Sequence, residues 1–118
     1  MPDLKNDAVK LAGSLYKTAD GRQSYEIYLA TSEFIFVAAK ILHEQFGFSK
    51  CHEPFVGLDE VITDCEREGI KLLLGWDIWS GIYLMAASEA GDAIVSEVGL
   101  YLNSIIQTSE FERYIHRW

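Results

Sequence analysis

Apolar residues recur at helical spacing in the first third of the chain. One such stripe, with members three or four residues apart, predicts a helix over residues 4–15. A second stripe predicts a helix from about residue 31 to residue 46, where Thr31 and Ser32 can cap the first turn. Gly47 is suited to end this helix, because glycine readily adopts the left-handed conformation found at helix C-termini.

The clearest helical period lies between residues 58 and 68. Its apolar members occupy positions i, i+3, i+4 and i+7, and charged side chains fill most of the other positions. We therefore expect a helix that buries one stripe, exposes an acidic side and stops at Gly69. The buried stripe consists of Leu58, Val61, Ile62 and Cys65.

Two apolar runs that favour β-structure follow, at residues 70–76 and 81–87. The four residues between them have the composition of a turn, so the two runs predict a hairpin over about 70–87. A hairpin alone is only marginally stable in water. Residues 24–30 alternate between polar and apolar side chains, and we expect them to supply a third strand.

Helical spacing returns after the hairpin. Ser88 can cap a long final helix, and a short C-terminal helix is expected from about Ser109. The expected fold is one α+β domain over residues 1–118, in which a small antiparallel sheet packs against about four helices. That sheet comprises the hairpin at about 70–87 and the strand at 24–30.

Composition agrees with one folded unit outside the membrane. The chain has 118 residues, 49% of them hydrophobic, which suits a single buried core. Its first residues lack the basic start and apolar stretch of a signal peptide, and charges and glycines interrupt the most apolar region, residues 70–87. Cys51 and Cys65 are too few for a secreted disulfide scaffold, so we expect two reduced thiols and a cytoplasmic location.

The negative charge is concentrated between residues 51 and 100. The formal net charge is −8, and residues 51–100 contain ten acidic side chains but only Arg67 and Lys71 as bases. Nucleic acid is therefore an improbable direct ligand, because phosphate binding needs a basic face. A basic protein partner is the natural complement, and an acidic surface kept for solubility is the alternative.

The sequence contains no complete catalytic or ligand-binding motif. His43 and the Cys51-His52-Glu53 run are of metal-ligand types, but there is no paired C-x-x-C and no H-E-x-x-H. Adjacent Cys51 and His52 invite a thiol-catalysis interpretation, yet catalytic pairs normally meet through the fold. The glycines are scattered singly rather than grouped in a phosphate-binding loop. We therefore expect no catalytic residue, no metal and no cofactor.

Aromatic side chains around the predicted hairpin turn are the remaining signal. Trp76 is expected in the core, whereas burial and exposure are equally open for Trp79. Asp77 is expected to bond nearby backbone amides and so to form the turn. An exposed aromatic ring beside carboxylates would suit the hot spot of a protein interface.

The segment Gly69–Ser88, GIKLLLGWDIWSGIYLMAAS, followed by an amphipathic helix, resembles small bacterial immunity proteins. The similar proteins belong to contact-dependent growth inhibition and related polymorphic toxin systems, and they share the small size and the acidic balance. The resemblance covers roughly the last half of the chain. It implies a cytoplasmic protein, not an enzyme, that binds and blocks one cognate toxin domain, often a basic nuclease.

The resemblance does not identify individual binding residues, because no position can be matched to a family motif. We therefore select candidate binding residues from the charge pattern. We expect the toxin to contact the acidic side of the 58–68 helix together with the hairpin turn. The predicted partner-binding residues are Asp59, Glu60, Asp64, Glu66, Glu68, Asp77 and Trp79.

Two other functions remain open. One is a small ligand-binding or enzymatic domain with a pocket near His43, Cys51 and His52. The other is a homo-oligomeric scaffold subunit that pairs through an edge strand of the hairpin. Metal analysis and a ligand screen would detect the first function, and a sedimentation measurement would detect the second.

Overall fold

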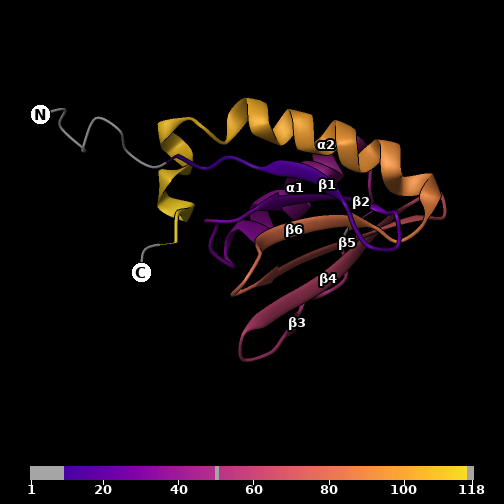
Figure 1. The fold of residues 1–118 in the computed structure, drawn as a ribbon, viewed down its shortest axis with the longest axis horizontal. Helices are drawn as coiled ribbons and strands as arrows, with labels where there is room; N and C mark the ends of the chain where they lie inside the picture. The colour runs from indigo at the N-terminus through magenta and orange to yellow at the C-terminus, as the bar shows by residue number, and fades with distance from the viewer. Residues whose placement is uncertain (1–9, 50, 117–118) are drawn as a thin grey trace, which may run out of the picture.

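The computed structural model describes residues 10–49 and 51–116, and its centre is one antiparallel sheet of six strands (Figure 1). The strands lie in the order β1-β2-β6-β5-β4-β3. Their bounds are β1 Ser14–Lys17, β2 Gln23–Ile27, β3 Phe55–Val56, β4 Glu60–Arg67, β5 Ile70–Asp77 and β6 Gly81–Ala86. The helical segments are α1 Phe34–Phe46, the short η1 Glu89–Gly91 that runs into α2 Asp92–Ile105, and the short η2 Ser109–Tyr114.

The predicted fold, a small sheet against about four helices, is wrong. Residues 60–67 form strand β4 instead of a helix, and residues 14–17 form β1. Residues 10–13 are not helical either, and the rest of the helix expected at 4–15 lies outside the described residues. Both segments join the sheet because its neighbouring strands offer complete hydrogen-bond ladders, which outweigh a local helical period.

Several individual elements agree with their predictions. The hairpin expected at about 70–87 is β5 and β6, and the strand expected at 24–30 is β2, which pairs with β6. Helix α1 ends at Gly47, as expected. Its first turn, however, has no side-chain cap, so the capping role expected of Thr31 and Ser32 is wrong.

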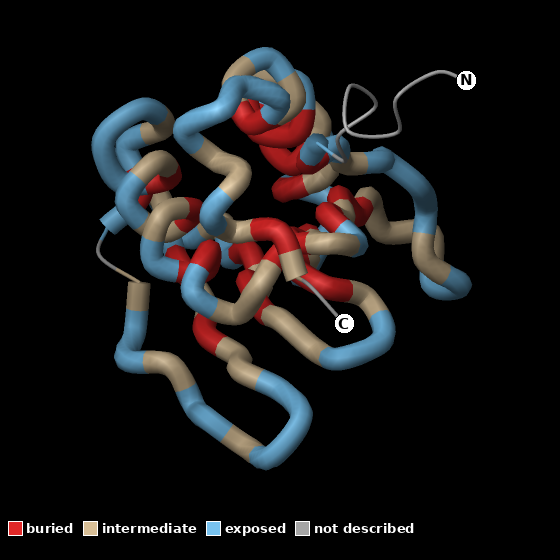
Figure 2. Tube along the Cα trace, turned by 90° about the vertical axis from the view of Figure 1, so that its left-hand side faces the viewer, coloured by how far each residue is buried: buried red, intermediate tan, exposed pale blue. Residues whose placement is uncertain are grey.

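One face of the sheet is buried under the two long helices. Tyr25 lies beside Leu84 across the β2–β6 ladder, Leu84 beside Leu74, and Leu74 beside Thr63, and all four side chains are buried. Helix α2 packs over β2 and β6, while α1 packs over β5. Figure 2 shows the buried segments gathered in the middle of the molecule, with the exposed β3–β4 turn at its lower end.

The helices and the N-terminal hairpin are joined by specific contacts. The rings of Phe46 on α1 and Tyr101 on α2 meet edge to face, with their centroids 5.6 Å apart. Asp92, the first residue of α2, accepts a hydrogen bond from the Gln23 amide at 2.8 Å and lies 3.4 Å from the Arg22 guanidinium. These contacts fix α2 against the start of β2.

The connection between α1 and β3 is fastened to β4 by a disulfide between Cys51 and Cys65. The Thr63 hydroxyl also donates a hydrogen bond to the His52 carbonyl. The expectation of two reduced thiols is therefore wrong. Strand β4 places the Cys65 side chain on the covered side of the sheet, next to this connection. Disulfides persist mainly in oxidising compartments. The reduced thiols therefore no longer support a cytoplasmic location, which stays a prediction.

Candidate protein-binding surface

The second face of the sheet is not covered by any helix in the described part of the chain. Across the strands, Glu26 lies beside Tyr83, Tyr83 beside Gly75, and Gly75 beside Ile62. The Tyr83 ring lies against Gly75, where a side chain would have no room. We call this surface the open sheet face. Its larger side chains are the exposed Tyr16, Glu60, Glu66 and Lys71 and the half-buried Glu26, Ile62, Asp64, Leu73, Asp77, Tyr83 and Met85.

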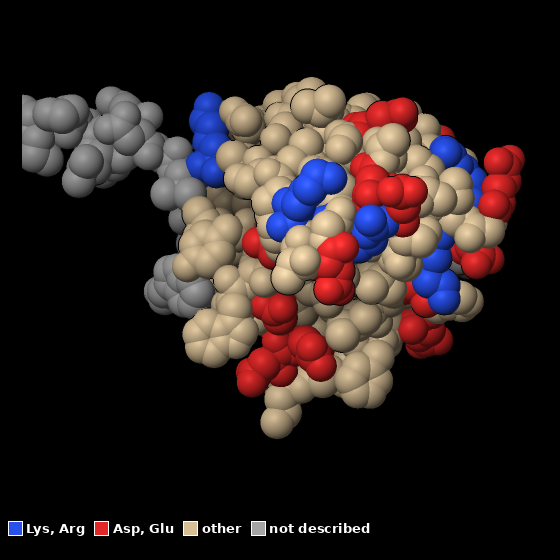
Figure 3. All heavy atoms as spheres, turned by 45° about the vertical axis from the view of Figure 1, so that its right-hand side comes forward, with Lys and Arg blue, Asp and Glu red and all other residues tan. Residues whose placement is uncertain are grey.

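The open sheet face carries four of the predicted partner-binding carboxylates. Glu60, Asp64 and Glu66 alternate along β4, and Asp77 ends β5 directly opposite Glu60. The predicted helical surface is corrected here, because the alternation of a strand, and not the turn of a helix, places these side chains together. In Figure 3, one group of acidic side chains lies near the lower edge of the molecule, where Figure 1 places β3 and β4, and other acidic side chains lie among the basic ones over the rest of the view.

The other three predicted residues lie in turns. Asp59 precedes β4, and Trp79 lies in the β5–β6 turn with 82% of its surface exposed. Glu68 lies in the β4–β5 turn, at the opposite end of β4 from Asp59, with a positive φ of 51°. Eight strand residues separate the two ends, roughly 25 Å. The structure therefore brings Asp59, Asp77 and Trp79 to one end of the sheet and leaves Glu68 far from them.

Asp64 is already neutralised within the chain. Its carboxylate bonds to the His52 imidazole and lies 3.6 Å from the Lys71 ammonium. The His52 hydrogen bond is the main reason that the pKa of the Asp64 carboxyl is lowered; burial opposes this effect, and the charges of His52 and Lys71 add to it. Of the acidic side chains on this face, Asp64 is thus the least available to a partner.

The two tyrosines of the open sheet face report negative charge around them. Burial raises the pKa of the Tyr83 hydroxyl, and the carboxylates of Asp77 and Glu60 raise it further. The Tyr16 hydroxyl donates a hydrogen bond to the Glu26 carboxylate, and its pKa is raised by burial first and then by this carboxylate. Aromatic and acidic side chains are therefore neighbours on this face, where Glu26 also lies beside Tyr83 across the β2–β6 ladder.

The end of the sheet with Trp79 also collects apolar side chains. The Ile78 amide donates a hydrogen bond to the Asp59 carbonyl at 3.2 Å, so the β3–β4 and β5–β6 turns lie side by side. They project from the lower left of the sheet in Figure 1. We call this surface the sheet-end patch. Its exposed side chains are Tyr28, Phe55, Val56, Leu58, Ile78 and Trp79; Phe55, beside Ile62, lies on the side of the open sheet face, and Val56, beside Val61, lies on the helix side.

Sequence reasoning missed most of the sheet-end patch. Leu58 was expected in the buried stripe of a helix, but it is fully exposed in a turn. Phe55 and Val56, which lie outside every predicted helix and strand, form β3 with 66% and 70% exposure. The one signal that could have drawn attention to them is an apolar pair placed between Pro54 and Gly57, two residues that favour turns.

The structure does bring together the three residues of the alternative pocket. His43, Cys51 and His52 line one hollow of about 590 Å³ between α1 and the connection to β3. Ile35 and Phe36 are among its apolar lining residues. Cys51 contributes a disulfide sulfur there, and no free cysteine occurs among the described residues. The thiol-catalysis interpretation of Cys51 with His52 therefore finds no thiol in this structure.

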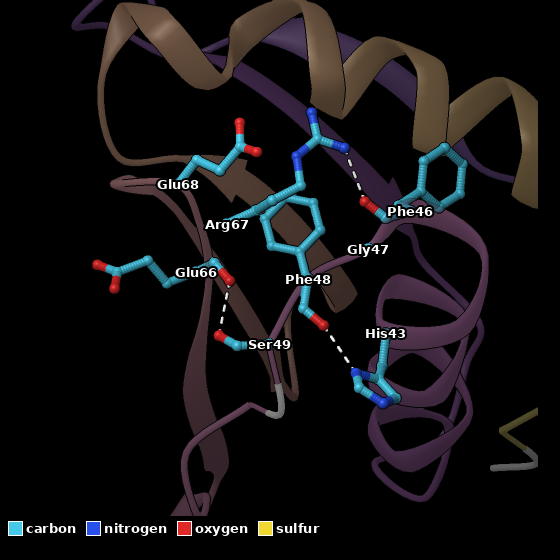
Figure 4. Close-up of a pocket in the computed structure, with 8 residues that line it drawn as sticks. All are labelled: His43, Phe46, Gly47, Phe48, Ser49, Glu66, Arg67 and Glu68. Atoms are coloured by element: carbon cyan, nitrogen blue, oxygen red, sulfur yellow. Dashed lines mark hydrogen bonds between the residues drawn. The ribbon is translucent and has the colours of Figure 1, made fainter.

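A neighbouring hollow lies on the other side of His43 (Figure 4). Its polar side chains already bond to backbone carbonyls: His43 Nδ1 donates to Phe48 at 2.7 Å, Ser49 Oγ to Glu66 at 2.7 Å, and Arg67 to Phe46 at 2.7 Å. The Glu66 carboxylate points away from the hollow. These groups do not converge on a point where a substrate atom could react.

Within residues 10–49 and 51–116, no three side chains of His, Cys, Asp or Glu lie close enough together to hold a metal ion. No helix in the same residues is long and apolar enough to cross a bilayer. The sequence matches no known family model, and neither a curated protein nor a solved structure proved similar to the chain.

Proposed function

We propose that this chain is an immunity protein that binds and neutralises a cognate toxin domain, with a basic nuclease as the class of toxin. The observation that supports the proposal is the sheet surface on which aromatic and apolar side chains lie among carboxylates: the open sheet face and its continuation, the sheet-end patch. The resemblance of Gly69–Ser88 to immunity proteins supplies the kind of partner. The proposed place of action is the cytoplasm.

Charge and apolar surface would act at different stages of such binding. The net charge of −8 would steer a basic partner toward the chain and raise the association rate. Aromatic side chains that lose water at the interface would slow dissociation. A nuclease active-site cleft attracts phosphate, so an acidic surface can occupy the cleft or dock beside it.

The proposal is tested by co-expression with the product of the neighbouring reading frame. We expect the two proteins to co-purify, and we expect this chain to restore growth to cells that express the toxin domain. A matched control is the double variant Glu44→Gln/Glu97→Gln, which removes two exposed charges from the helices and should leave rescue intact. Failure of the wild-type chain both to co-purify and to rescue growth would refute the proposal.

A small ligand-binding domain is the second candidate, because His43, Cys51 and His52 meet around one hollow of about 590 Å³. This volume falls within the range of small-molecule pockets, about 300–1,000 Å³. A fragment screen by NMR would test this function. Chemical-shift changes confined to the lining residues would favour it, and their absence, together with toxin rescue, would leave the immunity proposal alone.

A further inference from the structure

We propose that the sheet-end patch is the anchor of partner binding, and that it receives an apolar side chain flanked by lysine or arginine from a basic loop of the partner. This inference rests on the proposed function and assigns the contact surface for it. The centre of the patch is Leu58, Ile78 and Trp79 in the β3–β4 and β5–β6 turns, which the hydrogen bond from Ile78 to Asp59 holds together, while β3 and the end of β2 supply its other side chains.

Exposure of apolar side chains is concentrated at this end of the sheet. Most of the large apolar side chains that are exposed in the described residues belong to the patch, and Trp79 at its tip is 82% exposed. Single exposed apolar side chains need no explanation, but several of them at one end of a sheet, beside carboxylates, suit an interaction surface. Tryptophan is also the residue type most enriched in interface hot spots.

The charges beside the patch specify a cationic partner. Glu60 and Asp77 face each other across the β4–β5 ladder, and like charges in this position repel. The ion pairs among the described residues involve Asp92 and Asp64, and none joins a lysine or arginine to Asp59, Glu60 or Asp77; His116 lines the same small hollow as Asp77. A guanidinium or ammonium group placed between Glu60 and Asp77 would relieve their repulsion.

Two hydrogen bonds from the β5–β6 turn fix the position of the Asp77 carboxylate. Its Oδ1 atom accepts hydrogen bonds from the amides of Trp79 at 2.9 Å and Ser80 at 2.6 Å. These bonds fix both the carboxylate and the turn that presents Trp79. A surface that is ordered before binding loses less conformational entropy on association, which favours affinity.

Two other occupants fit the charges poorly. A second copy of this chain, related by a twofold axis, would bring the same carboxylates against each other. An anionic membrane surface would repel them, although an exposed tryptophan beside leucine can insert into lipid headgroups. Charge complementarity therefore favours a basic protein over both.

The first experiment needs no toxin and uses N-acetyl-leucyl-arginine amide as the probe. In NMR titrations at low salt, we expect millimolar binding that shifts the Trp79 indole resonance and the amides of residues 58–60 and 77–80. Added salt should weaken the binding. Shifts located elsewhere, no shift at millimolar concentrations, or equal shifts with N-acetyl-leucyl-glutamate would overturn the inference.

The second experiment measures affinity for the neighbouring gene product. Trp79→Ala is expected to weaken binding about thirtyfold or more, as at an interface hot spot. Leu100→Ala, which trims an apolar side chain 66% exposed on α2, is the matched control and should change affinity less than about twofold. Circular dichroism confirms that both variants fold.

The charge contribution is tested separately with Glu60→Gln and Asp77→Asn. Asparagine keeps an oxygen acceptor for the two turn amides, so Asp77→Asn removes the charge and retains the hydrogen bonds that form the turn. Both variants should slow association and reduce its salt dependence.

The outcomes separate the surface from the function. If Trp79→Ala, Glu60→Gln and Asp77→Asn all bind the partner as tightly as the wild-type chain does, the sheet-end patch is not the anchor, and the immunity function still stands. Peptide binding at the patch without toxin binding would refute the immunity function and retain the surface as a site for basic apolar segments. Binding of the wild-type chain to anionic vesicles, lost in Trp79→Ala, would replace the protein partner by a membrane.

Discussion

Asn103 joins three segments that are distant in the sequence. Its side-chain oxygen accepts hydrogen bonds from the Tyr25 hydroxyl at 2.6 Å and the Gly13 amide at 2.8 Å, and its amide donates to the Gly13 carbonyl at 3.0 Å. Tyr25 is fully buried, which raises the pKa of its hydroxyl. One half-buried asparagine thus satisfies polar groups from the start of the chain, from β2 and from α2.

Asn103→Ala is therefore expected to lower the free energy of unfolding by about 2–3 kcal/mol, because it leaves buried polar groups without partners. Tyr25→Phe is the matched control, because the Asn103 oxygen keeps its bond to Gly13; we expect a loss of only about 1 kcal/mol. Urea unfolding monitored by tryptophan fluorescence measures both. Equal effects of the two substitutions would contradict the proposed role of Asn103.

The contact between His52 and Asp64 makes stability depend on acid pH. A carboxyl whose pKa is lowered in the folded state contributes stability above its ordinary pKa of 3.8, and this contribution is lost as the pH falls through the lower folded value. We expect His52→Ala to raise the pKa of Asp64 and to flatten the pH dependence of unfolding below about pH 4.

Carbon-13 NMR titration of the Asp64 carboxyl measures the change. His43→Ala is the control, because the His43 ring bonds to the Phe48 carbonyl and not to a carboxylate. An unaltered Asp64 pKa in His52→Ala would show that Lys71, 3.6 Å away, supplies the effect instead.

At the scale of elements, residues 58–68 show why the sequence predicted part of the fold and misplaced the rest. Apolar side chains at positions 61, 62 and 65 imitate a helix, yet Val61 and Cys65 face the helices while Ile62 lies on the open sheet face. A strand with apolar groups on both faces has no clean alternation. The β-branched run Val61-Ile62-Thr63 was the one local signal for a strand.

The hairpin β5–β6 was predictable because its pairing is local and its turn is marked by Asp77. The pairing of β2 with β6 is not local, and no short-range pattern encodes it. The candidate surface depends on the same long-range arrangement. Sequence nominated Trp79 and Asp77 from their place in a turn, but the exposure of Leu58 could follow only from the corrected strand.

The disulfide gives a prediction for the connection before β3. Cys51 and Cys65 are 14 residues apart, and closing a loop of this length stabilises a protein by about 3 kcal/mol. A dithiol reductant should lower the free energy of unfolding of the oxidised protein by about that amount. Cys51→Ala, which cannot form the bond, is the control and should be insensitive to reductant. Indifference of the wild-type protein would show that the bond does not form in solution.

The whole molecule combines a sheet whose helices cover only one of its faces with a net charge of −8. Uncovered apolar faces promote self-association, while like charges oppose it. We expect a monomer by sedimentation equilibrium at low and at physiological ionic strength, because Glu60 and Asp77 would meet their own copies in a symmetric dimer. A dimer that Trp79→Ala dissociates would contradict this expectation and favour the scaffold function.

The strand order also determines when this protein can fold during its synthesis. Strand β2 pairs with β6, so that Ser24 faces Met85, and β6 is made last of all the strands. Translation adds roughly 5–20 residues per second, so the β1–β2 hairpin leaves the ribosome about three to twelve seconds before its partner. A two-stranded hairpin is barely stable alone. During that interval the edge of β2 that pairs with β6 in the folded protein is unpaired, so the sheet can be completed only after β6 has been made.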